Sequence, residues 1–145
     1  KFARKGGMVD FTAGEEPEKC ALPVLRTLEE VPPERITISS DAGGSLPRWS
    51  EDRRTMVGMG VGSMSTLLPV LRCLVTEHHV PLETAVCLVT RNVADGLYLS
   101  RKGRLTVGAD GDVLLLDRDW NVHTVLARGV PMVADGVPVK LPYLS

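Results

Sequence analysis

The sequence predicts an α/β unit followed by a small antiparallel β unit, and two observations lead to this fold class. A strand-like run, a helical pattern and a second strand-like run follow one another between Met8 and Ser40. Such an order implies a crossover connection, and therefore two parallel strands. Near the other end of the chain, Asp135 and Gly136 separate two runs rich in β-branched residues, which is typical of a tight antiparallel hairpin.

The first part of the chain contains the elements of the predicted α/β unit. The pattern over residues 7–12 indicates a short strand, and apolar residues recur at helical spacing over residues 20–31. Pro23 is expected in the first turn of this helix, where its missing N–H costs little. The two prolines at 32–33 end the helix, and the β-branched residues of 35–41 predict the second strand.

A long glycine-rich segment separates the second strand from a helical region. Residues 42–63 are predicted to form a loop, and a loop of this length in a compact domain is typically functional or disordered. After it, apolar residues at helical spacing predict helices over residues 66–78 and 81–89, and a short third helix that begins within residues 90–94.

The hydrophobic pattern changes from Leu105 onward, where short apolar runs replace the helical spacing. These strand-like runs lie within residues 112–117, 122–127 and 130–139. We therefore assign residues 1–104 to one domain and residues 105–145 to a second domain built from antiparallel strands.

The composition is that of an ordinary globular domain and excludes several classes of protein. The 145 residues carry 17 Lys and Arg against 18 Asp and Glu, with 4% aromatic residues. A general nucleic-acid binder needs surplus positive charge and stacking aromatics, so this class is not expected. No segment approaches the roughly 20 apolar residues that cross a bilayer, so no membrane partner is expected either.

The N-terminal residues and the cysteines suggest what kind of protein the chain comes from and in which compartment it resides. The N-terminal residues lack the uninterrupted apolar stretch of a signal peptide, and the chain does not begin with Met. We therefore expect a piece of a longer cytoplasmic protein. The three cysteines, Cys20, Cys73 and Cys87, are widely spaced and odd in number, which favours buried free thiols in a reducing compartment.

Asp41 is the residue most suggestive of chemistry. It stands at the end of a buried-type parallel strand, directly before a glycine-rich turn. In barrel and doubly wound folds this end of the strands carries the active site. A carboxylate placed there can bind a metal ion or accept a proton from a water molecule. A turn-forming or capping role for Asp41 is the competing interpretation.

Other candidate residues have simpler explanations. His78 and His79 end a predicted helix, where an imidazole favours the negative end of the helix dipole, and His123 alternates within a predicted strand. The glycines of 58–62 resemble a phosphate-binding loop, but no strand precedes them and no Lys follows at the required spacing. Ser63 is better explained as a helix cap.

Several motifs together carry a resemblance to a known family. They are residues 37–41 with 44–47, 60–61 with 66–68, 110–115, 127–129 and 132–136. These motifs resemble the isoaspartyl dipeptidases (β-aspartyl peptidases) of the amidohydrolase superfamily, and the resemblance extends over about residues 6–140. The Ser-Ser-Asp-x-x-Gly-Ser stretch that begins at Ser39 is fairly specific to the peptidase, whereas the later motifs are shared across the superfamily.

The resemblance implies a fold and a mechanism. It implies the last two βα units of a metal-dependent (β/α)8 barrel, followed by helices and part of a small β-sandwich domain. Enzymes of this family cleave the isopeptide bond of β-aspartyl dipeptides with a hydroxide that two zinc ions activate. Asp41 matches the family's metal-binding and proton-shuttling aspartate, and Ser45 matches a serine that contacts the substrate.

The sequence also departs from the family pattern, because the other zinc ligands of the family have no counterpart in this chain. One carboxylate cannot hold a zinc ion, which needs three or four protein ligands. A full barrel typically needs about 250 residues, so the chain corresponds to a C-terminal portion whose N-terminal barrel part is missing. The implied partners are a small dipeptide substrate, that missing portion and, by resemblance, further copies in a homo-oligomer.

Two alternatives to a dipeptidase stay open at this point. The parent protein could be another amidohydrolase, such as a D-aminoacylase-like deacylase or a dihydroorotase-like cyclic amidase. The isolated chain could instead be a catalytically incompetent fragment that acts only by associating with itself or a partner, since an open strand edge invites such association.

Overall fold

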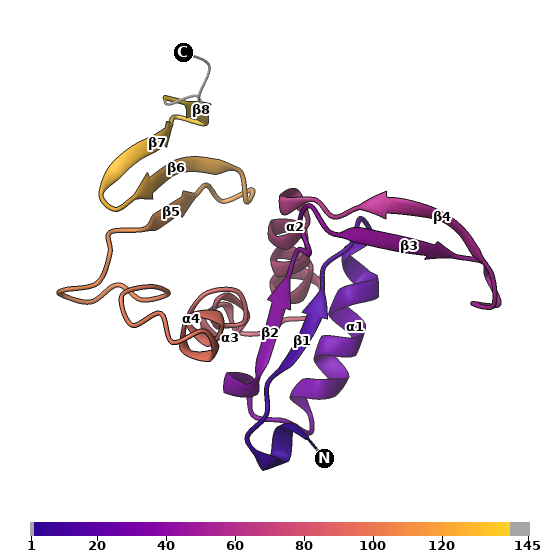
Figure 1. The fold of residues 1–145 in the computed structure, drawn as a ribbon. Helices are drawn as coiled ribbons and strands as arrows, with labels where there is room; N and C mark the ends of the chain where they lie inside the picture. Colours follow the sequence, from indigo (N-terminus) through magenta and orange to yellow (C-terminus); the bar gives the residue numbers. More distant parts are fainter. Residues whose placement is uncertain (1, 140–145) are drawn as a thin grey trace. The chain divides into compact units, whose positions relative to one another are not determined.

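The computed structural model describes residues 2–139, and these residues form two compact units (Figure 1). The first unit comprises Lys1–Val89 and the second Thr90–Ser145. The expected assignment of residues 1–104 and 105–145 to two domains of a larger fold stays a prediction. No helix within residues 2–139 combines the length and the apolar content that crossing a bilayer requires.

A pair of parallel strands forms the centre of the first unit, as the sequence predicts. Strand β1 (Val9–Thr12) pairs with β2 (Ile36–Ser39), and the helix α1 (Pro17–Leu28) connects them. Val9 lies opposite Ile36, and Thr12 lies opposite Ser39. Figure 1 shows α1 alongside the two strands. The strand–helix–strand order therefore produces the crossover that parallel pairing needs.

Helix α1 begins earlier than expected and contains Pro23 in its interior rather than in its first turn. Pro17 occupies the first helical position, where a fixed φ favours helix formation, and this starts the helix three residues before Cys20. Pro23 is exposed, and Lys19, four residues earlier, lies on the same exposed side. Because Pro23 has no N–H, the Lys19 carbonyl lacks its helical donor, and water can bond to it on this exposed side.

The two faces of the parallel pair have opposite character, because successive strand residues point to opposite sides. Ile36 and Ile38 are 0% and 2% exposed and belong to the apolar core. The other large side chains that are fully buried come from the helical segments and the residue directly after α3: Val24, Val70, Leu74 and Leu88. On the opposite face, Thr37 and Ser39 are polar, so the pair presents an apolar face to the helices and a polar face on its other side.

The prediction of a loop over residues 42–63 is wrong, because most of this segment is a β-hairpin. Strand β3 (Ser45–Trp49) pairs antiparallel with β4 (Met56–Val61). Gly58 and Gly60 alternate with Met and Val side chains along β4, so the high glycine content concealed a period-2 pattern. Figure 1 shows this hairpin extending away from the parallel strands.

The base of the hairpin is joined to the turn that follows β2. The Gly43 N–H donates to the Gly62 carbonyl at 3.1 Å, and the Gly62 N–H donates to the Gly44 carbonyl at 3.0 Å. This approach leaves no space for a side chain at Gly62, where an added Cβ would lie 2.0 Å from the Asp41 carbonyl oxygen. Glycine at position 62 is therefore required by close backbone packing.

A nearly continuous helical run follows the hairpin and confirms the two predicted helices of this region. Its segments are a 3-10 turn (Met64–Thr66), α2 (Leu67–Arg72), a π-helical turn (Cys73–Glu77) and α3 (Leu82–Cys87). The π-helical turn was not predicted. It is closed by a bond from the His78 N–H to the Cys73 carbonyl at 3.2 Å, which spans five residues instead of four.

The second unit contains the short helix α4 (Arg91–Gly96) and one antiparallel sheet. Its four strands lie in chain order and are β5 (Val113–Leu116), β6 (Val122–Ala127), β7 (Val130–Ala134) and β8 (Val137–Pro138). The hairpin predicted from the Asp-Gly pair is confirmed, because Asp135 and Gly136 connect β7 to β8 with φ values of 50° and 77°. Both angles suit a tight hairpin turn.

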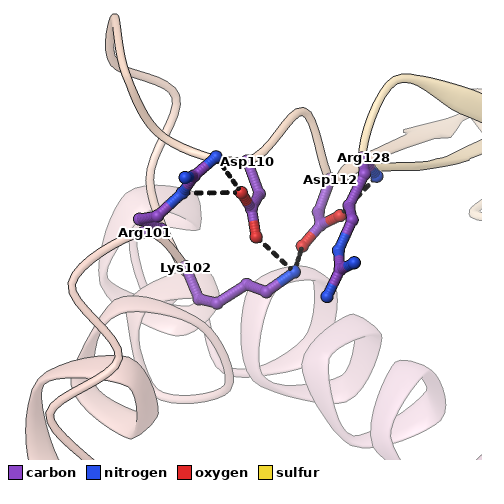
Figure 2. A network of polar contacts seen from close by, with 5 residues as sticks. All are labelled: Arg101, Lys102, Asp110, Asp112 and Arg128. Atoms are coloured by element: carbon purple, nitrogen blue, oxygen red, sulfur yellow. Dashed lines mark hydrogen bonds and ion pairs between the residues drawn. The ribbon is translucent and has the colours of Figure 1, made fainter.

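A network of ion pairs and hydrogen bonds holds the entry to this sheet (Figure 2). The Asp110 carboxylate accepts hydrogen bonds from the Arg101 guanidinium at 2.7 Å and the Lys102 ammonium at 2.9 Å. Lys102 also lies 2.5 Å from a carboxylate oxygen of Asp112, whose other oxygen accepts from the Arg128 N–H at 2.8 Å. The network therefore ties residues 101–102 to the start of β5 and to the β6–β7 turn.

This network should make the second unit sensitive to acid. Hydrogen bonds from Lys102 hold the pKa values of Asp110 and Asp112 below their ordinary range. The network therefore stabilises the folded state above the unfolded carboxyl pKa of about 4 and loses this contribution as the pH falls through the lowered values. We expect Lys102→Gln to reduce the loss of stability between pH 7 and pH 3, measured by urea unfolding. Identical pH profiles would contradict the stabilising role.

Gly62 provides a second test of the fold. We expect Gly62→Ala to destabilise the first unit by about 1–3 kcal/mol, because the added methyl group meets backbone that has to move. Gly58→Ala in the same hairpin is the matched control, since a Cβ there meets nothing within 4 Å. Urea unfolding of both variants distinguishes the two positions, and equal stabilities would show that the hairpin base is not closely packed.

Candidate functional site

Asp41 lies at the carboxyl-terminal edge of the parallel pair, two residues after β2 ends. Its side chain is exposed, and its backbone has a φ of 48°, in the left-handed region. Its carbonyl oxygen accepts a bond from the Gly44 N–H at 2.9 Å, which closes a turn. Asp is among the residues that tolerate this conformation, so the turn holds Asp41 without requiring glycine there. The turn and the strand edge together place its carboxylate in solvent at this edge.

Ser45 is the other predicted site residue, and it begins strand β3. It is exposed and lies opposite Val61 in the hairpin. The turn of residues 41–44 therefore connects Asp41 directly to Ser45. An added Cβ at Gly44 would lie 2.7 Å from an Asp41 carboxylate oxygen, so this carboxylate lies against the turn backbone. The structure places both residues beside the same edge, and their roles in catalysis and substrate binding stay predictions.

A cavity of about 350 Å³ opens beside this edge. Its lining comes from the segment after β1, the start of α1 and the base of the hairpin: Ala13, Gly14, Glu15, Glu16, Lys19, Leu46, Pro47, Arg48, Gly60, Val61, Gly62, Ser63 and Thr66. Neither Asp41 nor Ser45 is among these residues. The Arg48 guanidinium lies 4.0 Å from the Glu15 carboxylate, and the Lys19 ammonium lies 2.5 Å from that of Glu16. The cavity therefore carries both signs of charge.

Asp10 is a polar residue of this region that the sequence reasoning did not single out. Its carboxylate accepts hydrogen bonds from the Thr37 hydroxyl at 2.7 Å and the Ser39 hydroxyl at 2.6 Å. All three residues lie on the polar face of the parallel pair. The alternation of Ile and hydroxyl residues over 36–39 was the signal for this face, because it separates a buried side from a polar side.

The described residues do not by themselves complete a zinc site at Asp41. A zinc site needs at least three His, Cys, Asp or Glu side chains whose ligand atoms converge. Within residues 2–139, one such group is found, and it consists of Glu18, Cys73 and His78. Asp41 is not part of it. A zinc ion needs three or four protein ligands, so the ligands that would join Asp41 are not supplied by this part of the chain.

The Glu18, Cys73 and His78 side chains lie on α1 and on the helical run after the hairpin. The Glu18 carboxylate lies 3.0 Å from His78 Nε2 and 3.1 Å from Cys73 Sγ. These two hydrogen bonds hold the pKa of Glu18 below its ordinary value. Burial, with the nearby carboxylates of Glu18 and Glu77, raises the pKa of the Cys73 thiol to about 12. In the metal-free chain this thiol is therefore protonated at neutral pH.

The structure confirms some of the remaining predictions and corrects others. All three cysteines are free, as predicted, but only Cys20 and Cys73 are buried, whereas Cys87 is half-buried. Burial raises the pKa of Cys20 to about 11. The Ser63 hydroxyl accepts from the Ser65 N–H at 3.3 Å, which confirms its capping role. The glycines of 58–62 fall in the predicted loop of residues 42–63, but they lie within and directly after β4. His123 is an exposed residue of β6, whose Nε2 lies 3.3 Å from Asp135.

Comparisons with known proteins identify related folds. No family model matches the chain. A β-aspartyl dipeptidase from Fervidobacterium islandicum, crystallised with a β-Asp-Leu dipeptide, is 30% identical with a TM-score of 0.83. This match covers 98% of the chain and 38% of the relative. The chain therefore spans well under half the length of that enzyme.

Two further proteins extend the similarity beyond dipeptidases. An allantoinase from Deinococcus radiodurans is 37% identical over 82 residues, which cover 55% of this chain and 18% of the relative. An N-acetylglucosamine-6-phosphate deacetylase from Thermotoga maritima shares the fold with a TM-score of 0.61 at 18% identity over 86% of the chain. The chain is therefore similar over nearly its whole length to a part of a β-aspartyl dipeptidase, an enzyme of the amidohydrolase superfamily, and less extensively to an allantoinase and a deacetylase.

Proposed function

We propose that the chain is part of a metal-dependent hydrolase that cleaves β-aspartyl dipeptides, and that Asp41 is its contribution to the reaction. The observation that carries this proposal is the position of Asp41, an exposed carboxylate in a closed turn directly after a buried parallel strand. The 30% identity to a dipeptidase crystallised with β-Asp-Leu supports the substrate class.

The wider architecture of this proposal follows the predicted one. The parallel pair β1–β2 forms the last two strands of a (β/α)8 barrel, and the second unit contributes strands to a small β-sandwich domain. The polar face with Asp10 then lines the barrel interior. Active sites of such barrels lie at the carboxyl ends of the strands, which is where Asp41 and Ser45 are found.

The chemical role of Asp41 follows from the needs of amide hydrolysis. The attacking water has to lose a proton, and the departing amine has to gain one. An exposed carboxylate at the strand edge can accept the first proton and deliver it to the amine nitrogen. The metal ions of the family would polarise the carbonyl and lower the pKa of water, but their binding here requires ligands beyond residues 2–139.

Ser45 and the nearby cavity supply the proposed substrate contacts. The Ser45 hydroxyl is exposed beside the turn of Asp41 and is a hydrogen-bond partner for the substrate. A β-aspartyl dipeptide carries carboxylate and ammonium groups. Arg48 and Lys19 at the cavity can pair with the former, and Glu15 with the latter.

A second candidate function is hydrolysis of the allantoinase type. The match to an allantoinase favours it, because the two sequences are 37% identical over 82 residues. The match to the dipeptidase covers more of the chain, but at a lower identity of 30%. Asp41 would serve equally as the proton-carrying group there. The two functions differ in substrate, so a comparison of substrates distinguishes them.

The test is a chimeric enzyme in which residues 7–139 replace the matching portion of the Fervidobacterium islandicum dipeptidase. We expect hydrolysis of β-Asp-Leu in preference to allantoin and N-acetylglucosamine 6-phosphate, measured by release of leucine, by opening of the allantoin ring and by release of acetate, respectively. Asp41→Asn should reduce kcat by at least about 100-fold, because an amide cannot carry the proton. Asn also tolerates the φ of 48° at this position, so the backbone is preserved.

Asp135→Asn is the matched control for this test. Asp135 is also an exposed aspartate with a positive φ, of 50°, but it lies in the β7–β8 turn of the second unit. We expect this variant to keep the activity of the parent chimera. Near-normal kcat in Asp41→Asn would show that Asp41 does not carry the proton, and preference for allantoin would favour the second function.

A further inference from the structure

Glu18, Cys73 and His78 form a cluster of metal-binding side chains that the proposed function does not use. Glu18 comes from the first turn of α1, whereas Cys73 and His78 stand at the two ends of the π-helical turn. Their ligand atoms all lie within 4.8 Å of one another. The sequence separations of 55 and 60 residues from Glu18 show that packing of the helices, not local sequence, brings the cluster together.

The π-helical turn explains how Cys73 and His78 come to face the same carboxylate. Two side chains five positions apart in a regular α-helix point about 140° away from each other. The wider turn between these residues, closed by the bond from the His78 N–H to the Cys73 carbonyl, turns both side chains toward Glu18. π-Helical turns inside helices frequently occur at functional sites.

The three donors form a set that suits zinc. A thiolate, an imidazole and a carboxylate are the ligand types that zinc takes in proteins. With zinc–ligand distances of about 2.0–2.3 Å, the ligand atoms of a tetrahedral site lie about 3.3–3.7 Å apart. The observed separations of 3.0 and 3.1 Å from the Glu18 oxygen are slightly shorter, so small side-chain movements would admit the ion.

The cluster is also accessible from solvent on one side. Cys73 is 3% exposed, but the side chains of His78 and Glu18 are 23% and 50% exposed. A cation can therefore enter past the carboxylate and reach the buried sulfur. Three protein ligands leave a fourth position for water, and Glu77, which is close enough to act on the Cys73 thiol, is exposed beside it.

We propose that Glu18, Cys73 and His78 bind one divalent cation of the zinc class, in a site separate from Asp41. On binding, the Cys73 sulfur and His78 Nε2 each form a bond to the cation, and the protons of both atoms pass to solvent while the imidazole carries its remaining proton on Nδ1. Glu18 exchanges its two hydrogen bonds for a bond to the cation. The bound ion would join the start of α1 to the end of the helical run of residues 64–77. This site would stabilise the fold, because a cation that binds only the folded state adds to its stability.

The test uses Co²⁺ as a spectroscopic probe, followed by displacement with Zn²⁺. The reduced 145-residue chain is titrated with Co²⁺, and we expect one equivalent to produce a thiolate-to-cobalt charge-transfer absorption that Zn²⁺ abolishes. This absorption requires a cysteine ligand, so binding at a carboxylate such as Asp41 does not produce it. Zn²⁺ should also raise the thermal midpoint of unfolding.

Variants identify the ligands individually. Cys73→Ser should abolish the absorption, and its hydroxyl can still donate to Glu18 in the metal-free fold. Glu18→Gln changes a half-exposed residue and should weaken Zn²⁺ binding at least about tenfold while leaving the fold intact. Because Glu18→Gln does not disturb the core, it keeps the proposal testable even where Cys73→Ser fails to fold.

Cys87→Ser and His79→Asn are the matched controls. Cys87 lies in α3 outside the cluster, and His79 is adjacent to His78 with a φ of 56° that Asn tolerates. Both variants should bind Co²⁺ with the parent absorption. Absence of the charge-transfer band in the parent chain, or its survival in Cys73→Ser, would overturn the proposal, as would unchanged Zn²⁺ affinity in Glu18→Gln.

Discussion

Parallel pairing of β1 with β2 is the constraint on which the first unit depends. It requires the crossover through α1, and it buries Ile36 and Ile38 against the helical segments. The same pairing brings the carboxyl ends of both strands to one edge. The turn with Asp41, the base of the β3–β4 hairpin and the charged cavity all lie at this edge. The position proposed for catalysis at Asp41 therefore depends on the pairing of two short strands and on the burial of Ile36 and Ile38.

The sequence predicted those elements whose signals are local. The β-branched residues within 35–41 indicated β2, and the Asp135-Gly136 pair indicated the β7–β8 hairpin, because neighbouring residues determine each structure. The β3–β4 hairpin was missed because Gly58 and Gly60 alternate with Met59 and Val61 along β4. A glycine-rich pattern of this kind is more typical of a loop than of a strand. The cluster around Glu18 was missed for a different reason, since its members are far apart in the sequence and depend on a π-helical turn that helical periodicity does not reveal.

The similarity to β-aspartyl dipeptidases agrees with the resemblance found in the sequence, and the structure shows where its motifs lie. The Ser-Ser-Asp motif forms the end of β2 and its turn, whereas the Asp-Gly-Asp motif that ends at Asp112 belongs to an ion-pair network at the start of β5. The first motif thus occupies an exposed strand edge, and the second stabilises a fold.

The hydrogen bonds of Asp10 have a consequence for how the two parallel strands align. A shift of β2 by one residue would exchange its two faces, exposing the isoleucines and turning Thr37 and Ser39 toward the helices. The Asp10 carboxylate would then lose both hydroxyl donors, which lie at 2.7 and 2.6 Å in the observed alignment. A misaligned pair would thus be less stable for two reasons, the lost apolar burial and the two lost hydrogen bonds of Asp10. The hydrogen bonds of Asp10 therefore favour the observed register of β1 and β2.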